Sequence, residues 1–372
     1  MSVRIITGDC LAVLRTLDAE SVHCVVTSPP YWGLRDYGVA GQLGMEKTLG
    51  EHLAVMVEVF REVRRVLRKD GTCWVNYGDC YATSPNGRSA ADTKALGNDD
   101  RTFRDKPFST IGPIYVTDPR NPDRRGNHST LRGAPPPNTP GRIAAGGTLK
   151  PKDLCMISNR FAIALQDDGW WVRSEIVWHK PNPMPESVTD RPATAHEKVW
   201  LLTKSERYWY DAEAVRIPAA PATAPRAERA NTGTSAPGQA KHSGVCGPRR
   251  SDKQRGHTRR HQGFNDRWDK MERAEQLADG ANLRNVWTIA TAAFSEAHFA
   301  TFPPALIEPC IKAGCPVGGT VLDPFGGSGT TGLVADQLGR SAILIELNPE
   351  YAAMAHRRIK GDAPLLTDVV AA

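Results

Sequence analysis

Residues 320–346 read TVLDPFGGSGTTGLVADQLGRSAILIE, and this stretch decides the expected fold. It begins with a short apolar strand, Thr320–Leu322, which leads into a glycine-rich turn at 323–331. A helical pattern covers Gly332–Leu338, and a second apolar strand covers Ser341–Glu346. A strand, a helix and a strand at this spacing predict two parallel strands of an α/β sheet. Because ligands of open α/β sheets bind beyond the carboxyl ends of the strands, the turn is a candidate ligand site.

The same alternation of short apolar strands and amphipathic helices continues along the chain. The other predicted strands are Arg4–Thr7, Val22–Thr27, Thr72–Asn76, Trp170–His179 and Lys198–Thr203, the last two as an antiparallel hairpin with a long connection. The other predicted helices are Cys10–Leu17, His52–Arg68, Ile157–Gln166, Pro304–Ala313 and Pro349–Ile359. Residues 84–150 and 216–280 are expected to be irregular insertions, because they are rich in proline, glycine and polar residues. A short charged helix is expected in the second, at Arg267–Leu277.

The composition is that of a soluble protein. A chain of 372 residues predicts one large domain with an insertion, or two domains. No apolar run reaches the roughly 18 residues of a membrane span, and the N-terminus has the pattern of a strand rather than of a signal peptide, so we expect a cytoplasmic location. The eight cysteines include no C-x2-C pair and no histidine cluster completes a zinc pattern, so we expect reduced thiols and no structural metal.

A basic block occupies residues 241–260 of the second insertion. Its seven basic residues face one acid, so this segment alone carries the net charge of +6 that the whole chain carries. Such a block suits a polyanionic partner, and a solvated basic loop is the plain alternative. The arginines that we expect to contact a nucleic acid are Arg249, Arg250, Arg255, Arg259 and Arg260.

The glycine-rich turn has features of a nucleoside site. Glycines allow the backbone to approach a ligand closely. Glu346 ends the following strand, where an acid can accept both hydroxyls of a ribose. The turn matches neither a P-loop nor a clean G-x-G-x-x-G pattern, and a generic strand-to-helix turn is the alternative.

A second motif, TSPPYW at residues 27–32, follows an apolar strand near the N-terminus. Its two prolines stiffen the chain and leave carbonyl groups free to face a ligand. Ser28 and the carbonyl of Pro29 can accept hydrogen bonds from an amino group, and Tyr31 offers a flat face to a base. Trp32 extends or supports that surface. A Pro-Pro turn with aromatic packing is the structural alternative.

This motif suits methylation of an exocyclic amine. The amine of cytosine or adenine is a poor nucleophile, because its lone pair is delocalised into the ring. Two acceptors can draw the nitrogen toward a tetrahedral geometry, after which direct attack on a methyl group needs mainly positioning. The target base has to leave the duplex to reach such a pocket.

Together the two motifs resemble those of DNA amino-methyltransferases. Residues 323–331 resemble the cofactor motif of that family, 344–351 (LIELNPEY) its acidic strand, and 298–303 (HFATFP) the segment that lines its methionine pocket. Residues 28–32 resemble its [DNS]-P-P-[YFW] signature, which makes Ser28, Pro29, Pro30 and Tyr31 the candidate catalytic residues. The resemblance implies S-adenosylmethionine as cofactor, with Asp323 near its methionine end, Glu346 at its ribose, and Asp9 or Cys10 near its adenine. The full candidate cofactor set is Asp9, Cys10, His298, Phe299, Thr301, Phe302, Pro303, Asp323, Pro324, Phe325, Gly326, Gly327, Ser328, Gly329, Thr330, Glu346 and Asn348.

The catalytic motif precedes the cofactor motif, which is similar to the circularly permuted beta group of that family. The resemblance implies a Rossmann-like class I methyltransferase fold, an α/β fold with a seven-stranded, mostly parallel sheet, a β-hairpin and irregular insertions. The strands in family order one to five would be Thr320–Leu322, Ser341–Glu346, Arg4–Thr7, Val22–Thr27 and Thr72–Asn76. The expected organisation is a catalytic half at 1–83, insertions at 84–152 and 216–282, further sheet at 153–215 and a cofactor half at 283–372.

The resemblance implies double-stranded DNA as substrate, contacted by Trp32 and the basic block. Ser28 in first position favours cytosine-N4 methylation, with adenine-N6 methylation as the alternative. A cytosine-C5 enzyme would need a nucleophile such as Cys310, which instead falls in an apolar helical pattern. RNA and protein-glutamine methyltransferases place their motifs in the opposite order, and a catalytically inactive DNA-binding homologue is a further alternative. A cognate restriction endonuclease, association with the nucleoid through DNA and a monomer or homodimer are expectations.

Overall fold

The computed structural model describes residues 2–33, 39–82, 117–118, 121–125, 149–218, 280–292, 302–362 and 368–371. The chain divides into two compact units, one formed by Met1–Asp211 with Arg284–Ala372 and the other by Ala212–Leu283. The larger unit contains the main sheet and both sequence motifs. The expected helix at Arg267–Leu277 lies outside the described residues.

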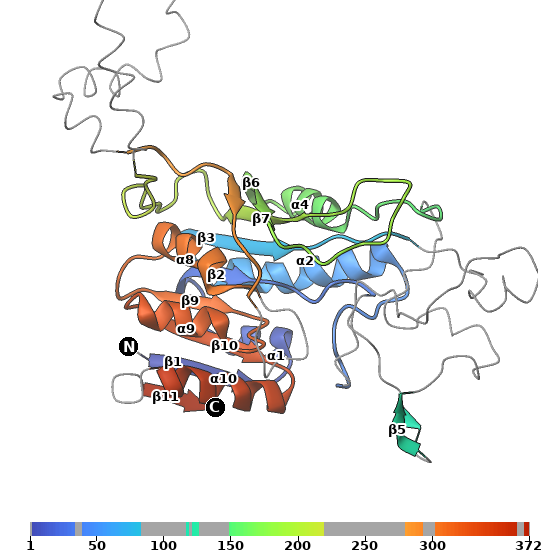
Figure 1. Cartoon of the computed structure of the whole chain (residues 1–372). Helices are drawn as coiled ribbons and strands as arrows, with labels where there is room; N and C mark the ends of the chain where they lie inside the picture. Colours follow the sequence, from blue (N-terminus) through green and yellow to red (C-terminus); the bar gives the residue numbers. More distant parts are fainter. Residues whose placement is uncertain are drawn as a thin grey trace, which may run out of the picture. The chain divides into compact units, whose positions relative to one another are not determined.

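The larger unit is built on a nine-stranded sheet in the order β11-β1-β10-β9-β2-β3-β7-β6-β8 (Figure 1). Neighbouring strands are parallel except at β7, which is antiparallel to both β3 and β6. The strands are β1 (Ser2–Thr7), β2 (Val22–Thr27), β3 (Leu67–Tyr77), β6 (Trp171–His179), β7 (His196–Thr203), β8 (Val286–Thr288), β9 (Thr320–Asp323), β10 (Ser341–Glu346) and β11 (Asp368–Ala371).

The seven predicted strands lie in this sheet in the order that a permuted methyltransferase requires. The strands numbered three, two, one, four and five from the resemblance are β1, β10, β9, β2 and β3, and the predicted hairpin β6–β7 follows. Two edge strands, β8 and β11, were not predicted, because three or four residues are too short to show a periodic pattern. A further antiparallel pair, β4 (Thr117–Asp118) and β5 (Asn121–Arg125), lies in the stretch expected to be irregular.

Helices form two layers against the sheet. One layer consists of α1 (Cys10–Thr16), α2 (Leu49–Val66) and α4 (Ile157–Asp167), and the other of α8 (Pro304–Gly314), α9 (Thr330–Gln337) and α10 (Pro349–Asp362). In Figure 1 the first set is coloured blue to green and the second orange to red. The connections between parallel strands therefore cover the sheet on both faces, as in a doubly wound fold.

Helix α2 begins three residues before the predicted start. Thr48 and Glu51 form a capping box, in which the Thr48 side chain accepts from the Glu51 N–H at 3.1 Å and the Glu51 carboxylate accepts from the Thr48 N–H at 3.2 Å. The helix ends at Val66, and β3 starts at the next residue, five residues before its predicted start.

Aromatic packing holds the carboxyl end of β3 against the helices. Phe161 of α4 meets Phe60 of α2 edge to face, with ring centroids 4.9 Å apart, and meets Tyr77 of β3 at 5.1 Å. All three side chains are fully buried. This cluster fixes the strand end that carries Asn76, next to Tyr77.

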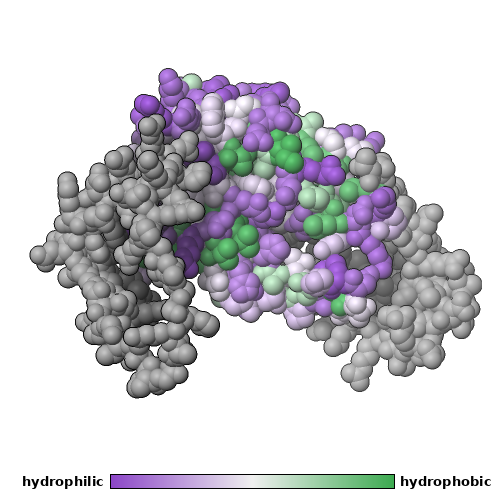
Figure 2. All heavy atoms as spheres, turned by 90° about the horizontal axis from the view of Figure 1, so that it is seen from above, coloured by the Kyte–Doolittle hydropathy of each residue, from purple (hydrophilic) through white to green (hydrophobic). Residues whose placement is uncertain are grey.

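The surface is mixed in character. Seen from above, hydrophilic residues dominate the described surface and apolar patches lie among them (Figure 2). Within the described residues, no helix is long and apolar enough to cross a membrane. The same residues contain no group of His, Cys, Asp and Glu side chains that could hold a metal ion.

Candidate active site

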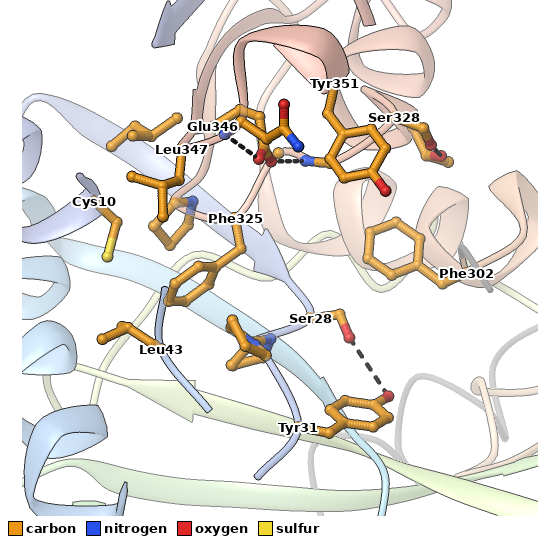
Figure 3. Close-up of a pocket in the computed structure, with 18 of the residues that line it drawn as sticks. Cys10, Ser28, Tyr31, Leu43, Phe302, Phe325, Ser328, Glu346, Leu347 and Tyr351 are labelled. Atoms are coloured by element: carbon orange, nitrogen blue, oxygen red, sulfur yellow. Dashed lines mark hydrogen bonds between the residues drawn. The ribbon is translucent and has the colours of Figure 1, made fainter. Parts of the chain in front are cut away.

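A cavity of about 260 Å³ lies at the carboxyl ends of five parallel strands (Figure 3). These ends are Gly8 after β1, Ser28 after β2, Asn76 in β3, Pro324 after β9 and Glu346 in β10. The predicted residues that line the cavity are Asp9, Cys10, Ser28, Pro29, Pro30, Tyr31, Phe302, Pro324, Phe325, Gly326, Gly327, Ser328, Thr330, Glu346 and Asn348. The fold therefore brings the two sequence motifs to one cavity.

Glu346 is held at one end of the cavity by two backbone groups. Its Oε2 accepts a hydrogen bond from the Gly327 N–H at 2.7 Å, and its Oε1 accepts one from the Asn348 N–H at 2.8 Å. Each oxygen of an ionised carboxylate has a second acceptor site, so the group can still receive two hydroxyls. Burial raises the pKa of Glu346, while these N–H groups act in the opposite direction.

Asp323 lies behind the turn and does not line the cavity. It is 1% exposed and accepts hydrogen bonds from the hydroxyls of Thr27 and Thr331, both at 2.6 Å, and from the Phe325 N–H at 3.0 Å. Burial raises its pKa to about 6 against the effect of these donors. Asp323 thus joins the last residue of the catalytic strand β2 to the cofactor turn.

The turn enters α9 through Gly329, the N-cap, whose φ of +78° lies in the left-handed region. A Cβ atom there would also come within 2.7 Å of the Cβ of Ala355, so this glycine serves the backbone and its packing rather than the cavity wall. Pro303 is likewise structural: it is buried and is the N-cap of α8.

Apolar side chains form the walls between the two ends of the cavity. Figure 3 shows Cys10 and Leu43 on one side and Phe302 on the other, with Phe325 between them. Burial raises the pKa of the Cys10 thiol to about 12, so this thiol stays neutral. Asp9, beside it, accepts from the Ala12 N–H at 2.8 Å and caps α1.

Tyr31 anchors a polar cluster at the other end of the cavity. Its one hydroxyl proton faces two acceptors, Glu197 Oε2 at 3.0 Å and Asn76 Oδ1 at 3.3 Å, and its oxygen accepts from the Ser28 hydroxyl at 3.5 Å. Figure 3 shows Ser28 and Tyr31 on the side of the cavity away from Glu346. Acceptor oxygens and an aromatic ring therefore converge where an amine-bearing base would enter.

Sequence reasoning missed several residues of this cluster. Asn76, Trp178, Lys180 and Glu197 all line the cavity. Asn76 ends a predicted strand, and a polar residue at such a strand end was a usable signal. Lys180 and Glu197 come from the hairpin β6–β7, and their sequence spacing indicates no chemistry.

A loop after the catalytic motif closes one side of the cavity with Val39, Gly41, Gln42 and Leu43. Its end is fixed by Glu46, whose carboxylate accepts from the Gly44 N–H at 3.1 Å and contacts Nδ1 of the fully buried His52 at 2.8 Å. Burial alone would raise the pKa of Glu46, but hydrogen bonds, above all that with His52, lower it.

Trp32 is 6% exposed, and its indole N–H donates to the carbonyl of Glu46 at 2.9 Å. This position matches the alternative in which Trp32 supports the motif, and it leaves little of the side chain for the predicted contact with DNA. His298, Phe299 and Thr301 lie outside the described residues, as do the five arginines of the basic block.

Cys310, the candidate nucleophile of a cytosine-C5 methyltransferase, does not line the cavity. Cys310 is 1% exposed inside α8, and its thiol donates to the carbonyl of Leu306 at 3.5 Å. Burial raises the pKa of this thiol, which disfavours the nucleophilic thiolate.

Comparisons with known proteins agree with this geometry. The DNA methylase family model for N6 and N4 methyltransferases matches residues 22–357. The chain is 40% identical over 368 residues to the Type II methyltransferase M.XycI of Xanthomonas campestris pv. cyanopsidis, which covers 98% of this chain and 90% of that protein. It is 37% identical over 358 residues to the Type II methyltransferase M.SmaI of Serratia marcescens, which covers 96% of this chain and 91% of that protein.

A solved structure shares the fold. The PvuII DNA methyltransferase, described as cytosine-N4-specific, aligns with a TM-score of 0.53 at 18% identity and covers 95% of this chain and 86% of its own. The predicted Rossmann-like architecture is thereby confirmed. The chain belongs to the DNA methylase family, the S-adenosylmethionine-dependent N4/N6 amino-methyltransferases of DNA.

Proposed function

We propose that this protein transfers a methyl group from S-adenosylmethionine to the N4 amino group of a cytosine in double-stranded DNA. The observation that carries the proposal is that Ser28 and Tyr31 share one cavity with Glu346 and the glycine-rich turn. One end suits a nucleoside cofactor and the other suits an amine-bearing base. The choice of cytosine over adenine N6 rests on serine as the first residue of the Ser-Pro-Pro-Tyr motif.

The cavity fits the cofactor in its chemistry. Glu346 would accept the ribose hydroxyls through the lone pairs that Gly327 and Asn348 leave unused. Phe302, Phe325 and Leu347 supply apolar walls for the less polar parts of the molecule. When bound, the cofactor supplies an electrophilic methyl group on its sulfonium.

The residues at the opposite end would activate and hold the target amine. Ser28 Oγ and the carbonyl of Pro29 would accept hydrogen bonds from its two N–H groups and pull the nitrogen toward a tetrahedral geometry. The ring of Tyr31 would stack on the base once it has left the duplex. The two prolines hold these groups with little freedom, so their orientation is set before the substrate arrives.

DNA is the expected partner, and the basic block with Arg249, Arg250, Arg255, Arg259 and Arg260 is proposed to contact it. The relatives named above are Type II methyltransferases. On this basis we infer a role in restriction-modification, with a cognate endonuclease as a partner.

The test is single-molecule sequencing of DNA from cells that express the protein, with the Ser28→Ala variant as control. We expect 4-methylcytosine at one defined recognition sequence, and none with the variant. Methylation at adenine N6 would replace the base assignment and keep the enzyme class. Unmethylated DNA from cells with the wild-type protein, together with no heat of S-adenosylmethionine binding in calorimetry, would identify an inactive homologue.

A further inference from the structure

Glu197 occupies the centre of the polar cluster at the target-base end of the cavity. Its Oε2 accepts from the Tyr31 hydroxyl at 3.0 Å and from the Asn76 amide at 3.1 Å. Its Oε1 forms an ion pair with the ammonium group of Lys180. One carboxylate on β7 therefore joins the catalytic motif, the end of β3 and the end of β6.

We propose that Glu197 is a positioning residue, which fixes the Tyr31 ring and the Asn76 amide in the orientation that the target base requires. This inference rests on the proposed function, because it concerns the same cavity. Glu197 belongs to neither of the two sequence motifs, so the inference adds a residue to the site.

The restraint on Tyr31 acts at two points. Glu197 and Asn76 hold the hydroxyl, while Gly78 packs directly against the ring: a Cβ atom there would lie 2.5 Å from Cε2 of Tyr31. The ring of Tyr77, tilted by 51° with centroids 5.5 Å apart, restricts it further. A side chain held at its tip and along its ring keeps one plane, which is the requirement for stacking on a base.

Lys180 stabilises the Glu197 carboxylate, which lies where little water reaches it. The Glu197 and Lys180 side chains are 20% and 18% exposed, so each charge has lost most of its contact with water. The attraction between the two charges, and the hydrogen bonds to the carboxylate, offset the cost of taking them out of water. The Lys180 ammonium also lies 4.4 Å from the centroid of the Trp178 ring, which holds the cation beside Glu197.

The test compares Glu197→Ala with Glu175→Ala in purified protein. Glu175 lies on the same hairpin and pairs with Lys198 at 2.8 Å, but it is 43% exposed and does not line the cavity. We expect Glu197→Ala to lower kcat about 10- to 100-fold, because misplacement of a reacting group has effects of this order. The Kd of S-adenosylmethionine should stay close to that of Glu175→Ala. The Tm should fall further than in Glu175→Ala, because Lys180 loses its partner, so kcat is compared at a temperature at which both variants are folded.

A double-mutant cycle with Tyr31→Phe shows whether Glu197 acts through the tyrosine. Phenylalanine lacks the hydroxyl that Glu197 holds, so Glu197→Ala should cost only about twofold more in that background. Glu197→Gln keeps an acceptor oxygen for Tyr31 and Asn76, so its kcat should lie between those of Glu197→Ala and the wild type. If the alanine variant does not fold, the cycle is measured with Glu197→Gln instead.

Several outcomes would overturn the inference while leaving the proposed function in place. In each of them the wild-type protein methylates DNA. In one, the kcat of Glu197→Ala equals that of the wild type. In another, the double variant loses kcat by the product of the two single losses, which shows that Glu197 and Tyr31 act independently. A loss of cofactor affinity as large as the loss of kcat would likewise assign Glu197 to general stability. If the wild-type protein itself fails to methylate DNA, the proposed function is the part that is wrong.

Discussion

The two ends of the cavity use different kinds of contact to hold their functional groups. At the cofactor end, backbone N–H groups hold the carboxylate that lines the cavity: Asn348 and Gly327, 2 and 19 residues away, both donate to Glu346. At the target-base end, side chains hold one another, as in the contact between Tyr31 and Glu197, which are 166 residues apart. The cofactor end is thus largely encoded by local sequence, whereas the target-base end exists only after the whole sheet has assembled.

The largest expected effect is a loss of methyl transfer, with cofactor binding unchanged, when the target-base end is altered. Ser28→Ala and Tyr31→Ala should each lower the rate of methyl transfer by at least about 100-fold, because they remove an acceptor for the amine or the stacking ring. The Kd of S-adenosylmethionine, measured by calorimetry, should stay near the wild-type value. Normal methylation by both variants would contradict the assignment of the catalytic residues.

At the cofactor end, a substitution should instead weaken the binding of S-adenosylmethionine. Glu346→Ala removes an acceptor for two hydroxyls and leaves the N–H groups of Gly327 and Asn348 without their partner. A hydrogen bond to a charged group contributes about 1.5–3 kcal/mol, so the loss of one of the two should already raise the Kd of the cofactor about 10- to 100-fold. Glu350→Ala, an exposed change on α10, is the matched control and should leave the Kd unchanged. Equal affinities in the two variants would exclude Glu346 from the binding site.

A third region, the basic block, should affect neither end. Replacing Arg249, Arg250, Arg259 and Arg260 with Gln should weaken DNA binding and flatten its dependence on salt. The slope of log K against log salt falls by roughly 0.9 for each phosphate contact that is lost. A titration of DNA binding at several salt concentrations measures this slope, and an unchanged slope would make the block a passive surface.

The smallest expected effect concerns Asp323, which joins the two ends. Its pKa is raised by burial to about 6, so in the range from about pH 4 to 6 the folded state binds a proton that the unfolded state does not. The contribution of this group to the free energy of unfolding therefore rises as the pH falls through 6, by at most about 1.4 kcal/mol per pH unit.

Asp323→Asn should remove this dependence. Denaturant unfolding at pH 7 and pH 5 gives the difference in stability between wild type and variant at each pH. We expect that difference to move in favour of the wild type at pH 5. A difference that is independent of pH would show that Asp323 does not titrate in this range.

The contrast between the two ends also explains what could be predicted. The turn and Glu346 are close in sequence and have a recognisable spacing, so the sequence alone could place both of them at the cavity. Asn76, Lys180 and Glu197 were missed, because they reach Tyr31 only through the pairing of β3, β7 and β6, and such contacts leave no local pattern. The burial of Asp323 and Trp32 could not be predicted either, because burial depends on neighbours from distant segments.

The order of the strands has a consequence for synthesis. β10 and β9 lie between β1 and β2 in the sheet, yet they follow residue 319 in the chain. The ribosome therefore completes the catalytic motif long before the strands that must separate β1 from β2 exist. Until β9 and β10 are synthesised, the edges of β1 and β2 that pair with them have no partner strand. Contacts between segments so far apart in sequence form slowly. We expect methylation activity to appear only after the C-terminal strands emerge, so a prematurely terminated chain would be inert however intact its Ser-Pro-Pro-Tyr sequence.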